Sequence, residues 1–165
     1  MGINFKSKRS ISVILIFATI ISYFLVTNFF IKTSSEPLFS KCFPAGTLLT
    51  TIQQPQSDLR IANQGQPGYL TYGPYSDLNA GVYKVTLSYS AEFEGSNMIV
   101  GAVDRAESSG TIPGTEVPLV PKAKGDNEYS EIFQAKSKLP GFEFRVFSNG
   151  KSTLEVKELC IKQTE

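Results

Sequence analysis

Strict alternation between apolar and polar side chains over residues 83–90 constrains the fold more than any other feature of this sequence. In this segment, YKVTLSYS, two tyrosines, a valine and a leucine share one parity, and a lysine, a threonine and two serines share the other. A helix would scatter these side chains, whereas a strand gives them one buried and one solvated face. Segments 142–146 (FEFRV) and 153–157 (TLEVK) alternate in the same way. The pattern predicts strands, with Tyr83 and Tyr89 in the core.

Further strand candidates bring the expected total to about eight. They lie at 47–52, 69–72, 98–103, 115–119 and 129–135, separated by turns rich in glycine, proline and asparagine. Many short strands separated by such turns are typical of a β-sandwich or a barrel. We therefore predict an all-β domain, and no segment beyond residue 37 is predicted to be a helix.

The last predicted strand changes phase along its length. Leu154 and Val156 have one parity, whereas Leu159 and Ile161 have the other. A β-bulge near residues 157–158 would return both pairs to the core, because a bulge adds one residue to one strand of a pair. The alternative is a strand that crosses between two sheets.

An uncharged, mostly apolar run of 21 residues at positions 11–31 precedes the strands. As a helix it would extend about 30 Å, which matches the hydrocarbon thickness of a bilayer. Lys6, Lys8 and Arg9 lie just before it, and basic residues tend to stay on the cytoplasmic side. We expect a single-pass signal-anchor with a cytoplasmic N-terminus and a periplasmic or extracellular C-terminal domain. The alternative is a cleaved secretory signal, but the run ends in VTNFFI rather than in small residues.

The chain is expected to divide into four parts. These are a basic cytoplasmic segment (1–10), the transmembrane helix (11–31), a polar tether (32–37) and one extracytoplasmic domain (38–165). Positions 1–32 contain four of the 16 basic residues, which leaves 12 against 15 acidic ones, a balance of −3. An acidic balance argues against a nucleic-acid partner.

The two cysteines, Cys42 and Cys160, bracket nearly all of the predicted domain. A disulfide between them would join the first strand to the last and would suit an oxidising compartment. The alternative is a pair of small, unpaired core residues, because spacing alone does not show that the two Cα atoms come within bridging distance.

The segment 69–85 contains the pattern G-P-Y-x-x-L-x-x-G-x-Y-x-V. Here the chain resembles jelly-roll carbohydrate-binding modules of the galactose-binding-domain-like type, including versions that accompany bacterial polysaccharide glycosyltransferases. The resemblance implies a jelly-roll sandwich, a glycan ligand and a membrane glycosyltransferase as a possible partner. Such modules hold sugars on exposed aromatic rings. The chain has no tryptophan, so the candidates are Tyr72, Tyr75 and Phe93.

Asp126, Asn127 and Glu128 form an acidic cluster in a predicted turn. Carboxylate and amide oxygens are the ligands that calcium prefers, and modules of the resembling type often carry a structural calcium ion. We therefore keep a calcium site as one interpretation of this cluster and a solvated acidic loop as the other.

Two classes of function fit the sequence. No P-loop, G-x-S-x-G or H-E-x-x-H motif is present, and histidine is absent, so we expect a non-enzyme. The first class is a membrane-anchored module that binds cell-envelope carbohydrate or assists a polysaccharide-synthesis enzyme. The alternative is a structural or assembly protein that docks a membrane partner through its sandwich face or its helix, with no small ligand.

Overall fold

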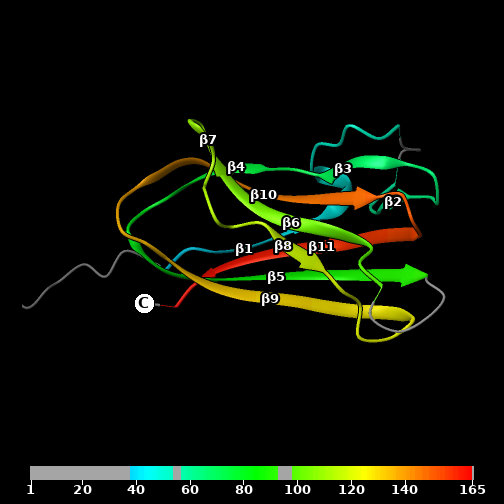
Figure 1. Cartoon of the computed structure of the whole chain (residues 1–165). Helices are drawn as coiled ribbons and strands as arrows, with labels where there is room; N and C mark the ends of the chain where they lie inside the picture. Colours follow the sequence, from blue (N-terminus) through cyan, green and yellow to red (C-terminus); the bar gives the residue numbers. More distant parts are fainter. Residues whose placement is uncertain (1–37, 54–56, 93–97, 165) are drawn as a thin grey trace, which may run out of the picture. The chain divides into compact units, whose positions relative to one another are not determined.

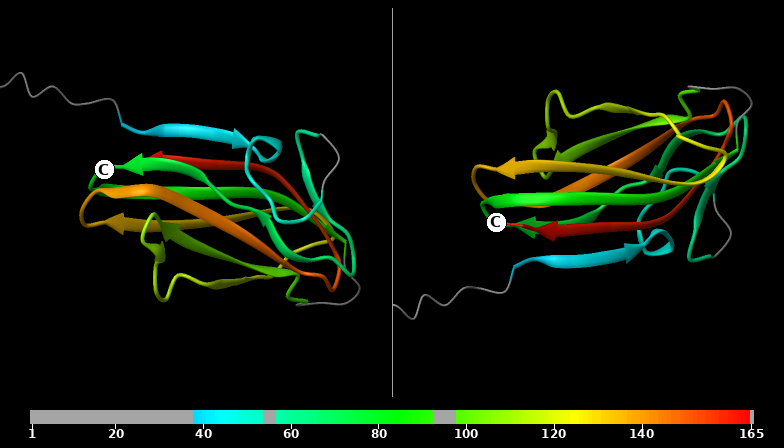
Figure 2. Two further views of the ribbon diagram at one scale, coloured as in Figure 1. Left: turned by 90° about the horizontal axis from the view of Figure 1, so that it is seen from above. Right: turned by 90° about the horizontal axis from the view of Figure 1, so that it is seen from below.

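A computed structural model describes residues 38–53, 57–92 and 98–164. The apolar run 11–31 and Phe93 lie outside these residues. The described part is an all-β domain in which two antiparallel sheets pack face to face (Figures 1 and 2). Within it, no helix has the length and apolar character needed to cross a membrane.

The first sheet has five strands in the order β1-β11-β5-β9, and β2 also pairs with β11 beside β1. Its strands are β1 (Ser40–Pro44), β2 (Arg60–Ala62), β5 (Gly81–Glu92), β9 (Gly125–Ala135) and β11 (Thr153–Gln163).

The second sheet has six strands in the order β3-β10-β6-β7, with β4 also on β10 and β8 also on β6. Its strands are β3 (Pro67–Thr71), β4 (Pro74–Leu78), β6 (Gly101–Glu107), β7 (Gly110–Thr111), β8 (Val117–Leu119) and β10 (Leu139–Asn149). Because β10 pairs with three strands, β3, β4 and β6, it forms the centre of this sheet.

The apolar faces of the two sheets form one core. Tyr83 and Tyr89 on β5 are 0% and 2% exposed, as the alternation predicts. The Tyr83 ring stacks on Phe133 of β9 with centroids 5.6 Å apart, and Phe133 stacks on Phe142 of β10 at 5.3 Å. This stack runs from the first sheet into the second, so aromatic packing contributes to holding the layers together.

The bulge predicted in the last strand is confirmed. The register between β11 and β5 shifts between Val156 and Glu158. As a result Leu154, Val156, Leu159 and Ile161 are all buried at 1% exposure or less. One extra residue therefore keeps a single long strand in one sheet.

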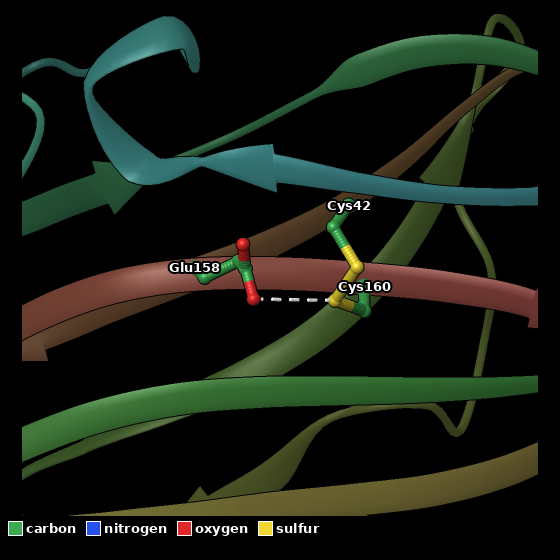
Figure 3. Close-up of a disulfide and its surroundings, with 3 residues drawn as sticks. All are labelled: Cys42, Glu158 and Cys160. Carbon is green, nitrogen blue, oxygen red and sulfur yellow. Dashed lines mark hydrogen bonds between the residues drawn. A yellow bond between two sulfur atoms is a disulfide. The ribbon is translucent and has the colours of Figure 1, made fainter.

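The predicted disulfide between Cys42 and Cys160 is also confirmed. The two cysteines lie directly opposite each other on β1 and β11 (Figure 3). Their Cα atoms are 4.0 Å apart, and Oε2 of Glu158 lies 3.4 Å from Sγ of Cys160. The bond joins the first strand of the domain to the last.

The predicted strand at 47–52 is not formed. A short 3-10 turn, η1 (Ala45–Thr47), occupies its start, and Leu49 makes only an isolated bridge to Tyr72. The guanidinium of Arg60 donates hydrogen bonds to the carbonyls of Gly46 (2.6 Å) and Leu48 (2.9 Å). A side chain thus satisfies carbonyls that a neighbouring strand would satisfy in a sheet.

The described domain has eleven strands, against the expected eight. Seven of the predicted strands correspond to observed ones. The unpredicted strands are β1, β2, β4 and β7, each of five residues or fewer. Strand β4 ends at Leu78, which is fully buried in the core.

The first and last described residues meet at one end of the sandwich, where the backbone N–H of Gln163 donates to the carbonyl of Phe39 at 2.7 Å. The loops after β2, before β9 and between β10 and β11 lie at the other end (Figure 1). Any ligand site in those loops therefore lies at the opposite end of the sandwich from the first and last described residues.

Candidate functional site

The outer face of the six-stranded sheet carries an unusual set of aromatic and charged side chains. On β10, Phe142, Phe144 and Val146 are buried, so the alternating residues between and after them point away from the core. These outward residues are Glu143, Arg145 and Phe147. Phe147 remains 38% exposed.

Aromatic rings from neighbouring segments extend from Phe147 along this sheet. Tyr69 lies opposite Phe147 in the β3–β10 register, with their rings edge to face and 5.6 Å apart. Tyr72 lies 6.5 Å from Tyr69 in the same kind of contact. Tyr75 follows on β4. We call these four residues (Tyr69, Tyr72, Tyr75 and Phe147) the aromatic face.

An ion pair holds the middle of this face. Arg145 donates from Nε to Oδ1 of Asp104 at 2.7 Å and from Nη2 to Oδ2 at 2.6 Å, and Nη2 also reaches Oγ1 of Thr111 at 2.6 Å. These hydrogen bonds to Asp104 raise the pKa of Arg145. The guanidinium carbon lies 5.2 Å from the centroid of the Tyr69 ring, within the range of a cation–π contact. Arg145 thus fixes the Tyr69 ring against the sheet.

Tyr75 is the most exposed ring of the aromatic face, at 49%. Its φ is 59°, a left-handed conformation that is uncommon for any residue but glycine. Desolvation and the charge of nearby Glu143 raise the pKa of Tyr75. The ring therefore stays neutral at physiological pH.

A shallow depression of about 230 Å³ lies at the edge of the aromatic face. It is lined by Tyr69, Ala102, Val103, Asp104, Glu116 and Phe147. Two rings supply apolar walls, and two carboxylates supply hydrogen-bond acceptors. Pockets for drug-sized ligands usually measure about 300 to 1,000 Å³. The depression therefore suits one small unit that has an apolar face and hydroxyl groups.

The three residues proposed as calcium ligands lie at the start of β9. Asp126 pairs with Lys157, with Oδ1 2.6 Å from Nζ. The Asn127 amide caps the preceding loop: Oδ1 accepts from the backbone N–H groups of Lys122 and Ala123, and Nδ2 donates to two carbonyls. Asn127 also has the opposite strand parity from Asp126 and Glu128. The structure thus gives Asn127 a structural role, and the calcium site stays a prediction.

The aromatic face includes two of the three predicted sugar-binding residues, Tyr72 and Tyr75. Phe93 lies outside the described residues. The structure adds Tyr69 and Phe147, which are not among the residues predicted from the sequence. Phe147 could have been found from parity, because it continues the outward series of Glu143 and Arg145. Tyr69 could not, because its partner depends on the irregular register between β3 and β10.

No protein-family model matches this chain, and no curated protein does. Solved structures do match in shape. A structure described as BiXyn10A CBM1 in the apo form is 14% identical, with TM-score 0.43 over 79% of this chain and 94% of that one. The CBM36-1 domain of a multidomain xylanase, from the hindgut metagenome of Trinervitermes trinervoides, is 12% identical, with TM-score 0.43 over 77% and 99%.

A third match is the CBM22-1–GH10 part of the Clostridium thermocellum xylanase 10B, complexed with xylohexaose. It is 14% identical, with TM-score 0.38 over 64% of this chain and 20% of that one. At these identities and scores, the matches record a similarity of shape and establish no function for this chain.

Proposed function

We propose that this protein is a membrane-anchored, non-catalytic module that binds carbohydrate on its aromatic face. The observation that carries the proposal is the depression between Tyr69 and Phe147, with Asp104 and Glu116 beside the two rings. The apolar face of a pyranose can pack on an aromatic ring while its hydroxyl groups donate to carboxylates.

The rigidity of this face supports a binding role. Arg145 is held by Asp104 and Thr111, and it in turn covers the Tyr69 ring. Side chains fixed before a ligand arrives lose little conformational entropy on binding. A docking surface for a protein partner would be expected to cover more area than this small depression offers. The geometry therefore favours a sugar over the assembly alternative.

Anchoring by residues 11–31 belongs to the same proposal. Lys6, Lys8 and Arg9 favour a cytoplasmic N-terminus, which would place the sandwich in the periplasm or outside the cell. Holding a weak sugar-binding module at the membrane raises its local concentration beside any glycan made or exported there. A polysaccharide-synthesis enzyme in the same membrane is the partner that such an arrangement would serve.

The test is glycan binding by the full-length protein in detergent micelles, first on an array of cell-envelope glycans and then by calorimetry with the best ligand. Phe147→Ala and Tyr75→Ala should each lower the affinity about 3- to 10-fold, the usual worth of one ring contact. Ile132→Ala is the matched control, because Ile132 is 69% exposed on β9 of the other sheet.

The proposal requires that the wild type bind at least one glycan and that the control bind as tightly as the wild type. If Phe147→Ala and Tyr75→Ala both keep wild-type affinity, the aromatic face is not the binding site. A wild type that binds no glycan would favour the assembly alternative instead.

A further inference from the structure

A second cavity, of about 380 Å³, is lined by residues from the loop after β2, the loop before β9 and the β10–β11 turn. These loops lie at the end of the sandwich away from the first described residues (Figure 1). The residues that line the cavity are Gln64, Glu92, Met98, Lys124, Lys151, Ser152 and Thr153. None of these residues lines the depression on the aromatic face. The two cavities are therefore separate sites.

Hydrogen bonds hold the loops that form the walls of this cavity, which we call the end cavity. The backbone N–H of Gly65 donates to the carbonyl of Gly150 at 2.8 Å, which ties the loop after β2 to the β10–β11 turn. Within that turn, Oδ1 of Asn149 accepts from the N–H of Lys151 at 2.9 Å. These contacts hold residues 151–153 at the cavity.

Ser152 lines the cavity and gives the clearest indication of what the cavity binds. Its side chain is only 5% exposed, and its Oγ is buried without a hydrogen-bond partner among the described residues. Buried hydroxyl groups in folded proteins nearly always have a partner, because an unpaired one loses the hydrogen bonds it makes to water. Ser152 therefore brings to the cavity wall a hydroxyl group that has no partner among the described residues.

The charges and donors around Ser152 indicate the class of ligand that the cavity suits. Lys124 and Lys151 bring two positive charges, and Glu92 brings one negative charge that lies 3.7 Å from Nζ of Lys124. Within the described ranges, Nζ of Lys151 and the side-chain amide of Gln64 have no hydrogen-bond or ion-pair partner. Lysine can only donate, and serine, threonine and glutamine donate readily. The cavity thus offers a positive, donor-rich lining.

We propose that the end cavity is a binding site for an oxyanion carried on a small polar molecule, a carboxylate or a phosphate. Lys151 would supply the charge, and the Ser152 hydroxyl with the Gln64 amide would supply neutral donors. Hydrogen bonds to a charged acceptor are stronger than those between neutral groups. Uronic acids and phosphorylated sugars are two sources of this chemistry. The site does not depend on sugar binding at the aromatic face.

The test uses the 15N-labelled full-length protein in micelles. Sodium glucuronate, sodium phosphate and glucose are titrated separately at one ionic strength, which is kept constant with sodium chloride. The backbone amides of residues 151–153 and the side-chain amide of Gln64 report binding by NMR. We expect saturable shifts with an oxyanion and none with glucose.

The titrations with glucuronate and with phosphate distinguish sugar acids from phosphorylated groups as ligands. Saturation by glucuronate alone assigns the cavity to sugar acids, saturation by phosphate alone assigns it to phosphorylated groups, and saturation by both supports the shared chemistry. Shifts that do not saturate with either oxyanion, or that saturate equally with glucose, overturn the proposal.

Two variants locate the site. Lys151→Gln should weaken oxyanion binding about 10-fold and Ser152→Ala about 5-fold, as expected for one charged and one neutral hydrogen bond. Without the probe, Ser152→Ala should unfold at the same temperature as the wild type or above it, because it removes a buried hydroxyl that has no partner. Lys162→Gln, at the other end of β11, is the matched control. Unchanged affinity in both cavity variants also overturns the proposal.

Discussion

Arg145 and Asp104 lie opposite each other across β10 and β6, and two parallel hydrogen bonds of 2.7 and 2.6 Å join them. Their side chains are only 17% and 14% exposed. A bidentate pair that is mostly shielded from water differs from a surface ion pair, because neither charge can recover its hydration without breaking the pair. This pair also fixes the ring of Tyr69, so it links the stability of the sheet to the shape of the aromatic face.

Replacing Asp104 by Asn should therefore lower the free energy of unfolding by about 1 to 3 kcal/mol, because Arg145 loses the negative charge and one of the two acceptors that Asp104 provides. Urea denaturation measures the change. The matched control is Lys138→Gln, which breaks the pair of Lys138 with Asp77, whose side chains are 59% and 56% exposed. An exposed pair contributes about 0 to 1 kcal/mol. Equal losses in the two variants would contradict the structural role of Asp104.

The raised pKa of Tyr129 leads us to expect that the domain loses stability at alkaline pH. Burial and the nearby carboxylate of Glu131 raise its pKa to about 12, against an ordinary value of 10.0. The folded state therefore keeps the phenolic proton that the unfolded state releases above pH 10. The contribution of Tyr129 to stability is fully present below pH 10 and is lost as the pH rises from 10 to 12.

The measurement is urea denaturation between pH 8 and 11 for the wild type and for Tyr129→Phe. Above pH 10, the free energy of unfolding of the wild type should fall more steeply than that of the variant, because the variant lacks this proton. The difference between the two free energies of unfolding isolates the contribution of Tyr129, because the lysines titrate in both proteins. Parallel curves would show that the pKa of Tyr129 is the same in the folded and unfolded states.

The disulfide closes nearly the whole domain into one loop, with a sequence separation of 118. On the chain-entropy model, a loop of this length stabilises the folded state by about 5 kcal/mol. Reduction with a phosphine should lower the free energy of unfolding by an amount of that order. The double variant Cys42→Ser with Cys160→Ser should match the reduced wild type and should not respond to the phosphine. A loss below about 1 kcal/mol would mean that the unfolded chain gains little freedom on reduction.

The alternation in the long strands was enough to predict the core of this fold. Side chains two residues apart must share a face, so the burial of Tyr83 and Tyr89 followed from parity alone. The change of parity in β11 left a bulge and a crossing between sheets as alternatives, and the register shift identifies the bulge. The short edge strands could not be predicted in this way. β2 and β7 have three and two residues, which is too short for a period of two to be recognised, and their pairing depends on neighbours distant in sequence.

The candidate site was predicted only in part for the same reason. The G-P-Y motif led to Tyr72 and Tyr75, because both lie in one continuous segment. Tyr69 and Phe147 are 78 positions apart in the sequence, and they meet only because β3 and β10 pair. The unpaired hydroxyl of Ser152 is likewise a property of the packed structure, since no sequence pattern shows which buried serine lacks a partner.

Gly101 provides a test of how closely β6 and β10 approach beneath the aromatic face. A Cβ atom at this position would lie 2.0 Å from the carbonyl oxygen of Phe147, and this neighbour is backbone that cannot rotate away. Gly101→Ala should therefore push the strands apart and lower the free energy of unfolding by about 2 kcal/mol or more. It should also move Phe147 and weaken any glycan binding on the aromatic face.

Gly65→Ala separates this steric effect from the conformational cost of losing a glycine. A Cβ at Gly65 would meet no atom within 4 Å, but its φ of +86° is unfavourable for alanine. That conformation costs about 1 kcal/mol. We expect Gly101→Ala to be the more destabilising of the two in urea denaturation. If Gly101→Ala cost no more than Gly65→Ala, β6 and β10 would have room to separate, and the aromatic face would be less rigid than its contacts indicate.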